Sequence, residues 1–312
     1  MNCLRALASA ALVLSAAAHG TRALADTPCD RPCLEGFLDR YLNALVSRDP
    51  TQLPLAPGAK LTENGQLLEP GDGLWGTIDA LGSYRLTFAD PGAREVGYFG
   101  TIKESAREQI LGVRLKVEHG ALSEMETFVV RPKPGFVFGA PQDLTLDPLL
   151  VQPLPSDARR PRAELVRIAN SYFEGLQKAT ETLTPFAADC QRIENGVVTA
   201  GNTDPAATLK MWRLGCHAQF ATHFSQFITQ IRDRRFPIVD EERGLVLALV
   251  FFDHGGRMKT QTLADGTVAP VPPDMQVPFT FEIAELFKID NGAIRRIQAL
   301  VIPAPYRMRS GW

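Results

Sequence analysis

The amino-acid sequence predicts an α+β protein built from two similar domains in tandem, each with helices on one face of an antiparallel sheet. An internal repeat is the first reason. The stretch Arg40–Gln66 (RYLNALVSRDPTQLPLAPGAKLTENGQ) returns 131 residues later as Ser171–Val197 (SYFEGLQKATETLTPFAADCQRIENGV), with the same spacing from tyrosine to Glu-Asn-Gly. The repeat therefore predicts that the second half of the chain folds like the first.

A second pair of matching stretches supports the same conclusion. Leu115–Leu122 (LKVEHGAL) reads like Phe287–Ile294 (FKIDNGAI), now at an offset of 172 rather than 131, so the second copy carries about forty extra residues. Solenoid repeats have periods of roughly 20–50 residues, so an offset this long indicates duplicated domains. In each copy one helical segment precedes a run of strands, which is typical of an α+β domain.

The N-terminal residues 1–25 have the pattern of a secretory signal peptide. Arg5 supplies the positive charge, Ala6–Ala18 is an apolar run too short to span a bilayer, and Ala23–Ala25 is a small-x-small cleavage site. We therefore expect a mature chain that begins near Asp26 and is periplasmic or secreted, with no membrane contact after cleavage. The formal net charge of −2 and the lack of a basic stripe argue against nucleic acid as a partner.

Four cysteines remain after that cleavage, and we expect them to form disulfides in an oxidising compartment. Three pairings are possible. We favour Cys29–Cys33, four residues apart at a helix start, together with Cys190–Cys216 inside the second repeat. Zinc binding by these cysteines is the alternative, but their spacing is poor for a zinc site, and we expect no metal.

In the first domain, residues 26–140, an amphipathic helix is expected after Asp30 and ends near Arg48, before Asp49-Pro50. A strand follows at Lys60–Glu63 and leads into an Asn-Gly turn. Period-two alternation then predicts four further strands. Their expected ranges are Arg85–Ala89, Glu95–Lys103, Gln109–His119 and Leu122–Arg131.

Residues 141–162 are rich in proline and are predicted to form a linker. The second domain, residues 163–312, begins with a helix whose apolar face runs from Leu165 to Leu176. A further helix is expected at Asp204–Gln219, and Gly255–Met275 is expected to be a long loop. The expected strands are Ser225–Arg232, Phe236–Val239, Gly244–Asp253, Phe279–Lys288 and Ala293–Ile302.

The order of helix, short helix, Glu-Asn-Gly strand and sheet resembles the nuclear-transport-factor-2 (NTF2-like) superfamily. That superfamily includes the SnoaL polyketide cyclases, ketosteroid isomerases and scytalone dehydratases. The stretches Val239–His254 and Pro305–Trp312 are also similar to an exported subfamily with this domain in tandem. The resemblance implies two cystatin-like cones with curved sheets, packed as an intramolecular pseudo-dimer that can exist as a monomer. It implies no single activity, because one fold hosts many functions.

Tyr41 and Tyr172 lie where the resemblance places the substrate-binding tyrosine of ketosteroid isomerases. Asn64 and Asn195 fall where those enzymes have a catalytic aspartate. An amide cannot abstract a proton, although it can donate a hydrogen bond to an oxyanion. The steroid isomerase mechanism is therefore disfavoured, and the asparagines are either polar pocket groups or Asn-Gly turn residues.

His254 is the first candidate for proton transfer, because it ends the apolar strand Leu245–Phe252, which we expect to be covered on both faces. Asp253 precedes it and could orient it. Adjacent strand residues point to opposite faces, so at most one of the two enters a pocket. The alternative is a polar strand end before the Gly-Gly turn.

His217 and His223 flank an aromatic run and are further candidates, with a hydrogen-bonded core or pocket histidine as the alternative. Trp212 and Phe220 could line an apolar ligand site, although many such side chains belong to the core. Glu282 and Glu285 lie an odd number apart on one strand, so only one is expected to face the cavity, and we choose Glu282 as a substrate-binding candidate. Surface pairing with arginine is the alternative for both.

The sequence has no G-x-S-x-G elbow, P-loop, dinucleotide fingerprint or H-E-x-x-H motif. We therefore expect no cofactor. The favoured hypothesis is a lyase, dehydratase or isomerase that acts on a small apolar or aromatic oxygenated molecule by general acid–base chemistry in the second domain. The rival hypothesis is a non-catalytic exported module that binds a small molecule or another protein.

Overall fold

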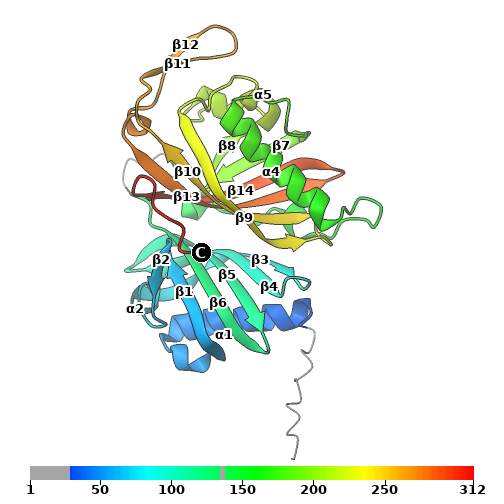
Figure 1. Cartoon of the computed structure of the whole chain (residues 1–312), viewed down its shortest axis with the longest axis vertical. Coiled ribbons are helices and arrows are strands. Elements are labelled where there is room, and N and C mark those ends of the chain that lie inside the picture. The colour runs from blue at the N-terminus through cyan, green and yellow to red at the C-terminus, as the bar shows by residue number, and fades with distance from the viewer. Residues whose placement is uncertain (1–28, 134–137) are drawn as a thin grey trace, which may run out of the picture.

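The computed structural model describes residues 29–133 and 138–312, so the predicted signal peptide lies outside the described residues. Two domains are stacked along the long axis of the molecule, each with one long helix on the outer face of its sheet (Figure 1). Each domain contributes a six-stranded sheet. This arrangement confirms the predicted α+β class with two tandem domains in which helices cover a curved sheet.

The first sheet has the strand order β2-β1-β6-β5-β4-β3. Strand β1 pairs with β6 in parallel, and the other neighbours are antiparallel. The elements of this domain are α1 (Arg31–Ser47), η1 (Pro50–Gln52), β1 (Leu55–Glu63), β2 (Gln66–Leu68), α2 (Leu74–Thr77), β3 (Ile78–Asp90), β4 (Glu95–Glu104), β5 (Arg107–Glu118) and β6 (Ala121–Val130).

The second sheet repeats this topology strand for strand, in the order β8-β7-β14-β13-β10-β9, again with one parallel pair, β7 and β14. Between the two domains lie η2 (Pro141–Asp143) and α3 (Pro148–Val151). The second domain contains α4 (Arg162–Lys178), β7 (Phe186–Glu194), β8 (Val197–Ala200), η3 (Lys210–Arg213), α5 (Cys216–Phe220), β9 (Ile228–Asp240), β10 (Leu245–His254), β11 (Thr260–Thr262), β12 (Val268–Pro270), η4 (Pro273–Gln276), β13 (Phe279–Asp290) and β14 (Ala293–Ala304).

Local sequence explains where the two long helices begin and end. The side chain of Asp30 caps α1 by accepting a hydrogen bond of 3.1 Å from the backbone N–H of Cys33. The helix ends at Arg48, which has a left-handed backbone (φ 57°), and Pro50 follows. Helix α4 ends in the same way at Ala179 (φ 48°). One face of each helix is buried against its own sheet.

Two expectations about the second domain are wrong. The helix expected at Asp204–Gln219 is only the 3-10 turn η3 and the short helix α5, because glycine at 215 separates two segments that lack a continuous apolar stripe. The strands expected at Ser225–Arg232 and Phe236–Val239 form one strand, β9, whose register shifts against β10 disturb the alternation. The loop at residues 255–275 holds the small hairpin β11–β12.

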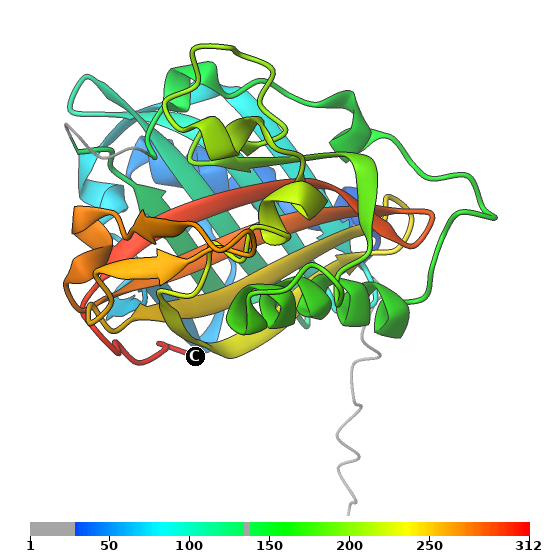
Figure 2. The same cartoon turned by 90° about the horizontal axis from the view of Figure 1, so that it is seen from above.

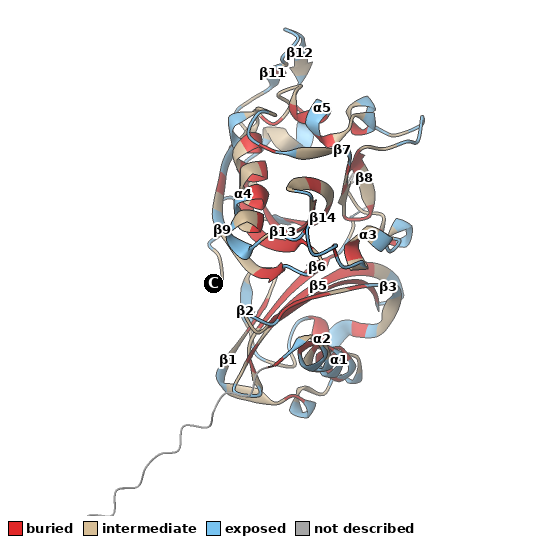
Figure 3. Cartoon of the chain, turned by 90° about the vertical axis from the view of Figure 1, so that its right-hand side faces the viewer, coloured by how far each residue is buried: buried red, intermediate tan, exposed pale blue. Residues whose placement is uncertain are grey.

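A layer of apolar side chains lies between the two sheets. On β10, Leu245, Leu247 and Leu249 belong to this layer, whereas Val246 and Val250 pack toward α4. All residues of β10 are buried, so the expectation that this strand is covered on both faces is confirmed. Figure 3 shows buried residues on strands to both sides of the domain boundary. The sheets therefore pack face to face over a common core.

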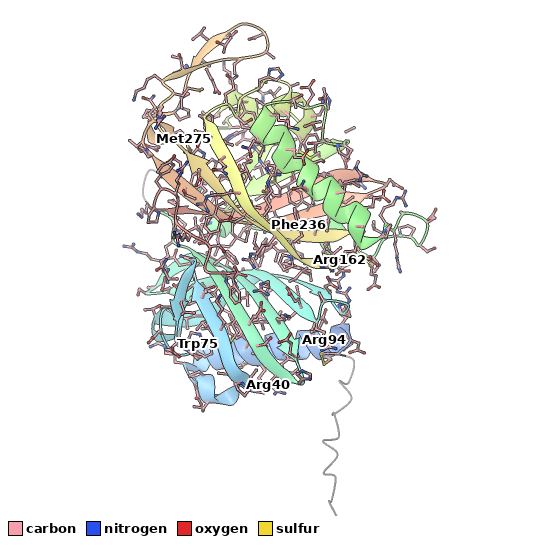
Figure 4. All side chains as sticks on the ribbon, viewed as in Figure 1. Arg40, Trp75, Arg94, Arg162, Phe236 and Met275 are labelled. Carbon is pink, nitrogen blue, oxygen red and sulfur yellow. A yellow bond between two sulfur atoms is a disulfide. The ribbon has the colours of Figure 1, made fainter. Side chains whose placement is uncertain are left out.

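Two ion pairs cross the domain boundary in a reciprocal way. Arg31 at the start of α1 contacts Asp240 at the end of β9, with 2.8 Å between guanidinium and carboxylate. Arg162 at the start of α4 contacts Asp90 at the end of β3. In Figure 4 Arg162 lies at the boundary between the domains. Equivalent residues contact each other in both directions, which is the mark of a two-fold interface.

Both predicted disulfides are present, Cys29–Cys33 and Cys190–Cys216, with Cα–Cα distances of 5.2 and 5.6 Å. Such bonds persist in oxidising compartments and agree with an extracellular location. Within residues 29–133 and 138–312, no helix is long and apolar enough to cross a bilayer.

Candidate functional site

A cluster of polar side chains lies inside the second domain, between its helices and the concave face of its sheet. Its members come from five different elements, and each is at most 5% exposed. They are Tyr172 on α4, Arg192 on β7, Thr199 on β8, Gln219 on α5 and Glu285 on β13. Buried polar groups are costly unless they are hydrogen-bonded, so this cluster must satisfy itself internally.

The guanidinium of Arg192 is the centre of the cluster. It donates from Nη1 to the hydroxyl of Tyr172 at 3.1 Å and from Nη2 to Oε1 of Gln219 at 2.5 Å. Its Nε donates to the hydroxyl of Thr199 at 3.0 Å and lies 3.3 Å from the carboxylate of Glu194. Arg192 is thus held from three sides in one orientation.

Glu285 is the acidic member of the cluster. Burial raises the pKa of Glu285 to about 8, the nearby charge of Glu194 adds to the rise, and Arg192 and a hydrogen bond with Tyr172 oppose it. Burial also raises the pKa of Tyr172 well above its usual value. At neutral pH the carboxyl of Glu285 is therefore mostly protonated and can act as an acid.

Aromatic rings enclose the polar cluster. Tyr172 lies 5.2 Å from the ring centroids of both Phe220 and Phe287. Phe186 and Phe220 make an edge contact at 4.9 Å. This apolar surrounding excludes water, which strengthens the electrostatic interactions of Arg192.

The first domain offers an internal comparison, because matching strand registers identify equivalent positions. Leu61 pairs with Met125 as Arg192 pairs with Ile297, so Leu61 occupies the place of Arg192. Val113 pairs with Thr127 as Glu285 pairs with Ala299. Both Leu61 and Val113 are buried in the apolar core. The same scaffold therefore folds without either charge.

The predicted Tyr172 and Phe220 belong to this cluster, and the equivalent Tyr41 lies in the apolar core of the first domain. Tyr41 makes an edge contact with Trp75 at 5.6 Å. Trp212 is buried outside the cluster, with its ring 6.3 Å from that of Phe138. Of the predicted aromatic residues, only Tyr172 and Phe220 contact each other at the site.

Asn64 and Asn195 occupy structural positions. The side chain of Asn195 donates to the carbonyl of Val301 and accepts from its N–H, both at 2.8 Å. Asn64 makes the same two contacts with Val129, at 3.1 and 2.7 Å. Both asparagines have left-handed backbones (φ 48°), as their turns require. Their amides are therefore occupied by the backbone of the last strand of each sheet-forming repeat, β6 and β14, as in the turn-residue alternative.

His254 and Asp253 point to opposite faces of β10. His254 is stacked on Phe279 at 4.3 Å, and its Nδ1 lies 3.2 Å from the carbonyl of Phe252. Burial lowers the pKa of His254 to about 4, so its ring is neutral at pH 7. Asp253 faces the other way and pairs with Arg232 at 2.8 Å. Neither residue contacts the cluster around Arg192 in the hydrogen bonds of the described chain.

The other predicted polar residues are also apart from this cluster. His217 is exposed on α5, and the ring of His223 lies 3.8 Å from Glu181. Glu282 faces the first domain, where burial and the charge of Glu126 raise its pKa to about 8. Glu285 is the glutamate of β13 that faces the helices. The expectation that the two glutamates face opposite sides is thus met, but the choice of Glu282 for the cavity of the second domain is corrected to Glu285.

Arg192 and Gln219 are cluster members that sequence reasoning missed. A signal for Arg192 was present in the repeat, because an offset of 131 aligns it with Leu61. An offset of 172 likewise aligns Glu285 with Val113. An ionisable residue aligned with a core aliphatic residue marks a position where the two domains differ in their buried side chains. Gln219 has no such signal, because it belongs to an insertion.

Two cavities formed by the described residues lie outside the domain interiors. One, of about 500 Å³, lies between the starts of α1 and α4 and is lined by both reciprocal ion pairs, Arg31–Asp240 and Arg162–Asp90. The other, of about 330 Å³, is lined by Glu35 and other residues near α1. No cluster of three or more His, Cys, Asp or Glu side chains in the described part of the chain could hold a metal ion.

Comparisons with known proteins give a partial match. Residues 158–301 match a family described as a domain of unknown function (DUF8021), and this range includes the whole cluster around Arg192. No curated protein matches the chain.

Similar solved structures align with about one domain each. A de novo designed protein with a curved β-sheet shares 14% identity over 33% of this chain and 88% of its own, with a TM-score of 0.27. A protein of unknown function with a cystatin-like fold from Methylobium petroleophilum PM1 shares 15% sequence identity over 35% of this chain and 84% of its own, with a TM-score of 0.28. AclR from Streptomyces galilaeus, provisionally a hydroxylase, shares 10% sequence identity over 46% of this chain and 91% of its own, with a TM-score of 0.28.

Proposed function

We propose that the second domain is a cofactor-independent lyase, dehydratase or isomerase that moves a proton on a small, apolar or aromatic, oxygenated molecule. The observation that carries this proposal is the presence of Arg192 and Glu285 in a core where the first domain has Leu61 and Val113. Charges that the fold does not need are expected at functional sites, where stability is given up for chemistry.

Each group in the cluster has a chemical role in this proposal. Glu285, protonated near neutral pH, donates a proton to a leaving hydroxyl or to a carbon atom, and its carboxylate takes a proton back. Arg192 and Tyr172 donate hydrogen bonds to an oxygen that becomes negative in the transition state. Phe186, Phe220 and Phe287 provide an apolar surface for the body of the substrate. The first domain then serves as a partner for the sheet and carries no chemistry.

The test begins with native mass spectrometry of the mature protein purified from its own host, which identifies a bound small molecule. Turnover of that molecule is then compared between the wild type and Glu285→Gln. Loss of a general acid is expected to lower kcat by about 100- to 10,000-fold. His254→Phe serves as the matched control and should retain activity. Full activity in Glu285→Gln would refute the proposed role of the carboxyl.

A non-catalytic exported module is the second candidate. It is favoured by the filling of the second domain's interior, where aromatic side chains pack directly on the cluster. In that case the protein would bind a small molecule or another protein without chemical change. A ligand that stays intact during prolonged incubation with wild type, and that binds Glu285→Gln equally well, would favour this candidate over the enzyme.

A further inference from the structure

We propose that the side chain of Gln219 occupies the place of a substrate carbonyl group, and that the substrate of the second domain is a planar carbonyl compound whose oxygen replaces Oε1 of Gln219 on Arg192. This inference rests on the proposed function and narrows its substrate class. It also assigns a role to the segment 201–227, which connects β8 to β9.

The segment 201–227 is one of two insertions that distinguish the second domain from the first, the other being residues 255–278 between β10 and β13. The first domain joins the equivalent strands, β2 and β3, through residues 69–77 alone. In Figure 2 the inserted segment (yellow-green) lies over the second sheet, beside α4 (green). Gln219 and Phe220 are among its buried residues and are 0% and 1% exposed. Residues 203–206 and 208–210 are exposed.

The amide of Gln219 is oriented by its neighbours. Its Nε2 donates to the backbone carbonyls of Thr199 at 2.7 Å and Met211 at 3.2 Å. These two acceptors require the nitrogen on their side, so the oxygen must face Arg192. The guanidinium Nη2 therefore meets a planar carbonyl oxygen, held at 2.5 Å.

The carbonyl oxygen of a reacting substrate would interact more strongly with Arg192 at this position than the amide oxygen of Gln219 does. The amide oxygen carries only a partial charge, whereas the oxygen of a substrate that becomes enolate-like carries a full one. The interaction with Arg192 would then be stronger in the transition state than in the resting protein, as catalysis requires. The hydroxyl of Tyr172, which already accepts from Arg192 at 3.1 Å, lies beside the same oxygen position.

The substrate can reach Arg192 only when Gln219 leaves, and the structure indicates where the segment would stay attached. The disulfide Cys190–Cys216 ties the start of α5 to β7, three residues before Gln219. Backbone bonds of Gly201 to Leu214 and of Asn202 to Trp212 hold the first part of the segment. A further fixed point lies after Gln219, because the hydroxyl of Ser225 donates to the backbone carbonyl of Leu176 at 2.7 Å. The part that moves is therefore the short stretch between Cys216 and Ser225, which carries Gln219.

The experiment uses Gln219→Ala in the full mature chain. This substitution removes a fragment with the size and shape of acetamide, so acetamide is the probe. Expected results are a saturable rise of the unfolding midpoint by several degrees and a downfield shift of the carbonyl resonance of bound ¹³C-acetamide. Both effects should vanish in Gln219→Ala with Arg192→Leu.

Matched variants make each outcome decisive. Gln298→Ala removes another buried glutamine, on the opposite face of the sheet, and should show no response to acetamide. Gln219→Ser replaces the alanine variant if the latter does not fold. A response that persists without Arg192, or its absence in both Gln219 variants, overturns the inference. Glu285→Gln in the same background should still bind acetamide, so a failure of the proposed acid–base chemistry is distinguishable from a failure of this site.

Discussion

Arg192 and Glu285 are placed where stability alone would favour apolar side chains. Taking a guanidinium and a carboxyl out of water costs free energy that their contacts inside the protein often do not recover. The first domain shows the apolar solution at the same positions, Leu61 and Val113. The protein therefore contains both versions of one core within a single chain.

This comparison predicts the effect of exchanging one version for the other. The double variant Arg192→Leu with Glu285→Val should raise the free energy of unfolding by about 1–4 kcal/mol, because burying a guanidinium and a carboxyl is often less favourable than burying apolar side chains of similar volume. Urea denaturation followed by circular dichroism measures the change. Arg192→Leu alone should be less stable than the double variant, since it leaves the polar carboxyl of Glu285 buried beside an apolar side chain. A double variant less stable than the wild type would show that the cluster serves the fold.

Glu285 should also make stability depend on pH. Its pKa rises from 4.5 to about 8 on folding, so the folded protein holds a proton that the unfolded chain releases between these values. The free energy of unfolding of the wild type should therefore fall as pH rises from about 5 to 8, relative to Glu285→Gln. The difference should reach about 1.4 kcal/mol per pH unit. Denaturant titrations of both proteins at pH 5, 6.5 and 8 give this difference, and parallel curves would contradict the shifted pKa.

The residue scale is where prediction from sequence was weakest. Tyr172 was identifiable because the repeat and the helix register both point to it. Arg192 was missed because a strand arginine is ordinarily exposed and its neighbours in sequence do not mark it as buried, so that only its alignment with Leu61 in the repeat indicates its position. His254 looked like a base at a sheet rim, yet three-dimensional packing gives it an aromatic partner, Phe279, and a neutral ring.

At the scale of elements, the segment 201–227 is held by one covalent link. Removing the disulfide with Cys190→Ala and Cys216→Ala should cost about 3.5 kcal/mol on a chain-entropy basis, because the bond closes a loop of 26 residues. Limited proteolysis should then cut first within this segment, at exposed residues such as those near Leu209.

The other disulfide provides the control for that experiment. Cys29 and Cys33 lie only four positions apart in the sequence, so their removal should cost about 2 kcal/mol and should not expose residues 201–227 to protease. Equal proteolysis of both variants would mean that the Cys190–Cys216 bond does not hold the segment in place.

The sequence predicts regular elements well where their periodicity is long. The two long helices and most strands follow from apolar spacing and from the repeat. The region after β8 could not be predicted, because short turns such as η3 and α5 are set by tertiary contacts and by a disulfide rather than by propensity. The sequence predicted two strands in place of β9, because the bulges of this strand interrupt the alternation of apolar and polar residues.

On the scale of the whole molecule, the C-terminal residues connect the domains. Trp312 returns to the first sheet, where its Nε1 donates to Thr62 at 2.9 Å. Its ring lies 4.2 Å from the amino group of Lys60 and 4.7 Å from the guanidinium of Arg114. Arg232 of the second domain holds the same tail through the carbonyl of Met308, at 2.7 Å. The tail is therefore a strap across the boundary.

Trp312→Ala should lower the free energy of unfolding by about 1–2 kcal/mol, through the loss of cation–π contacts and of one hydrogen bond. Tyr306→Ala, an exposed residue of the same tail, should change it by less than about 0.5 kcal/mol. Calorimetry measures both values. A Trp312 variant as stable as the wild type would show that the strap adds nothing to domain docking.

The reciprocal ion pairs Arg31–Asp240 and Arg162–Asp90 form an interface like that of a homodimer, but between two domains of different sequence. In a homodimer every substitution occurs in both subunits, so a destabilising charge would be introduced twice, once in each core. With both halves on one chain, a mutation in one half leaves its counterpart unchanged. The second domain can then contain the destabilising residues Arg192 and Glu285, while the first domain keeps an apolar core and stabilises the second by packing against it. Because the two domains belong to one chain, their cores can differ in sequence, which is impossible for two identical subunits.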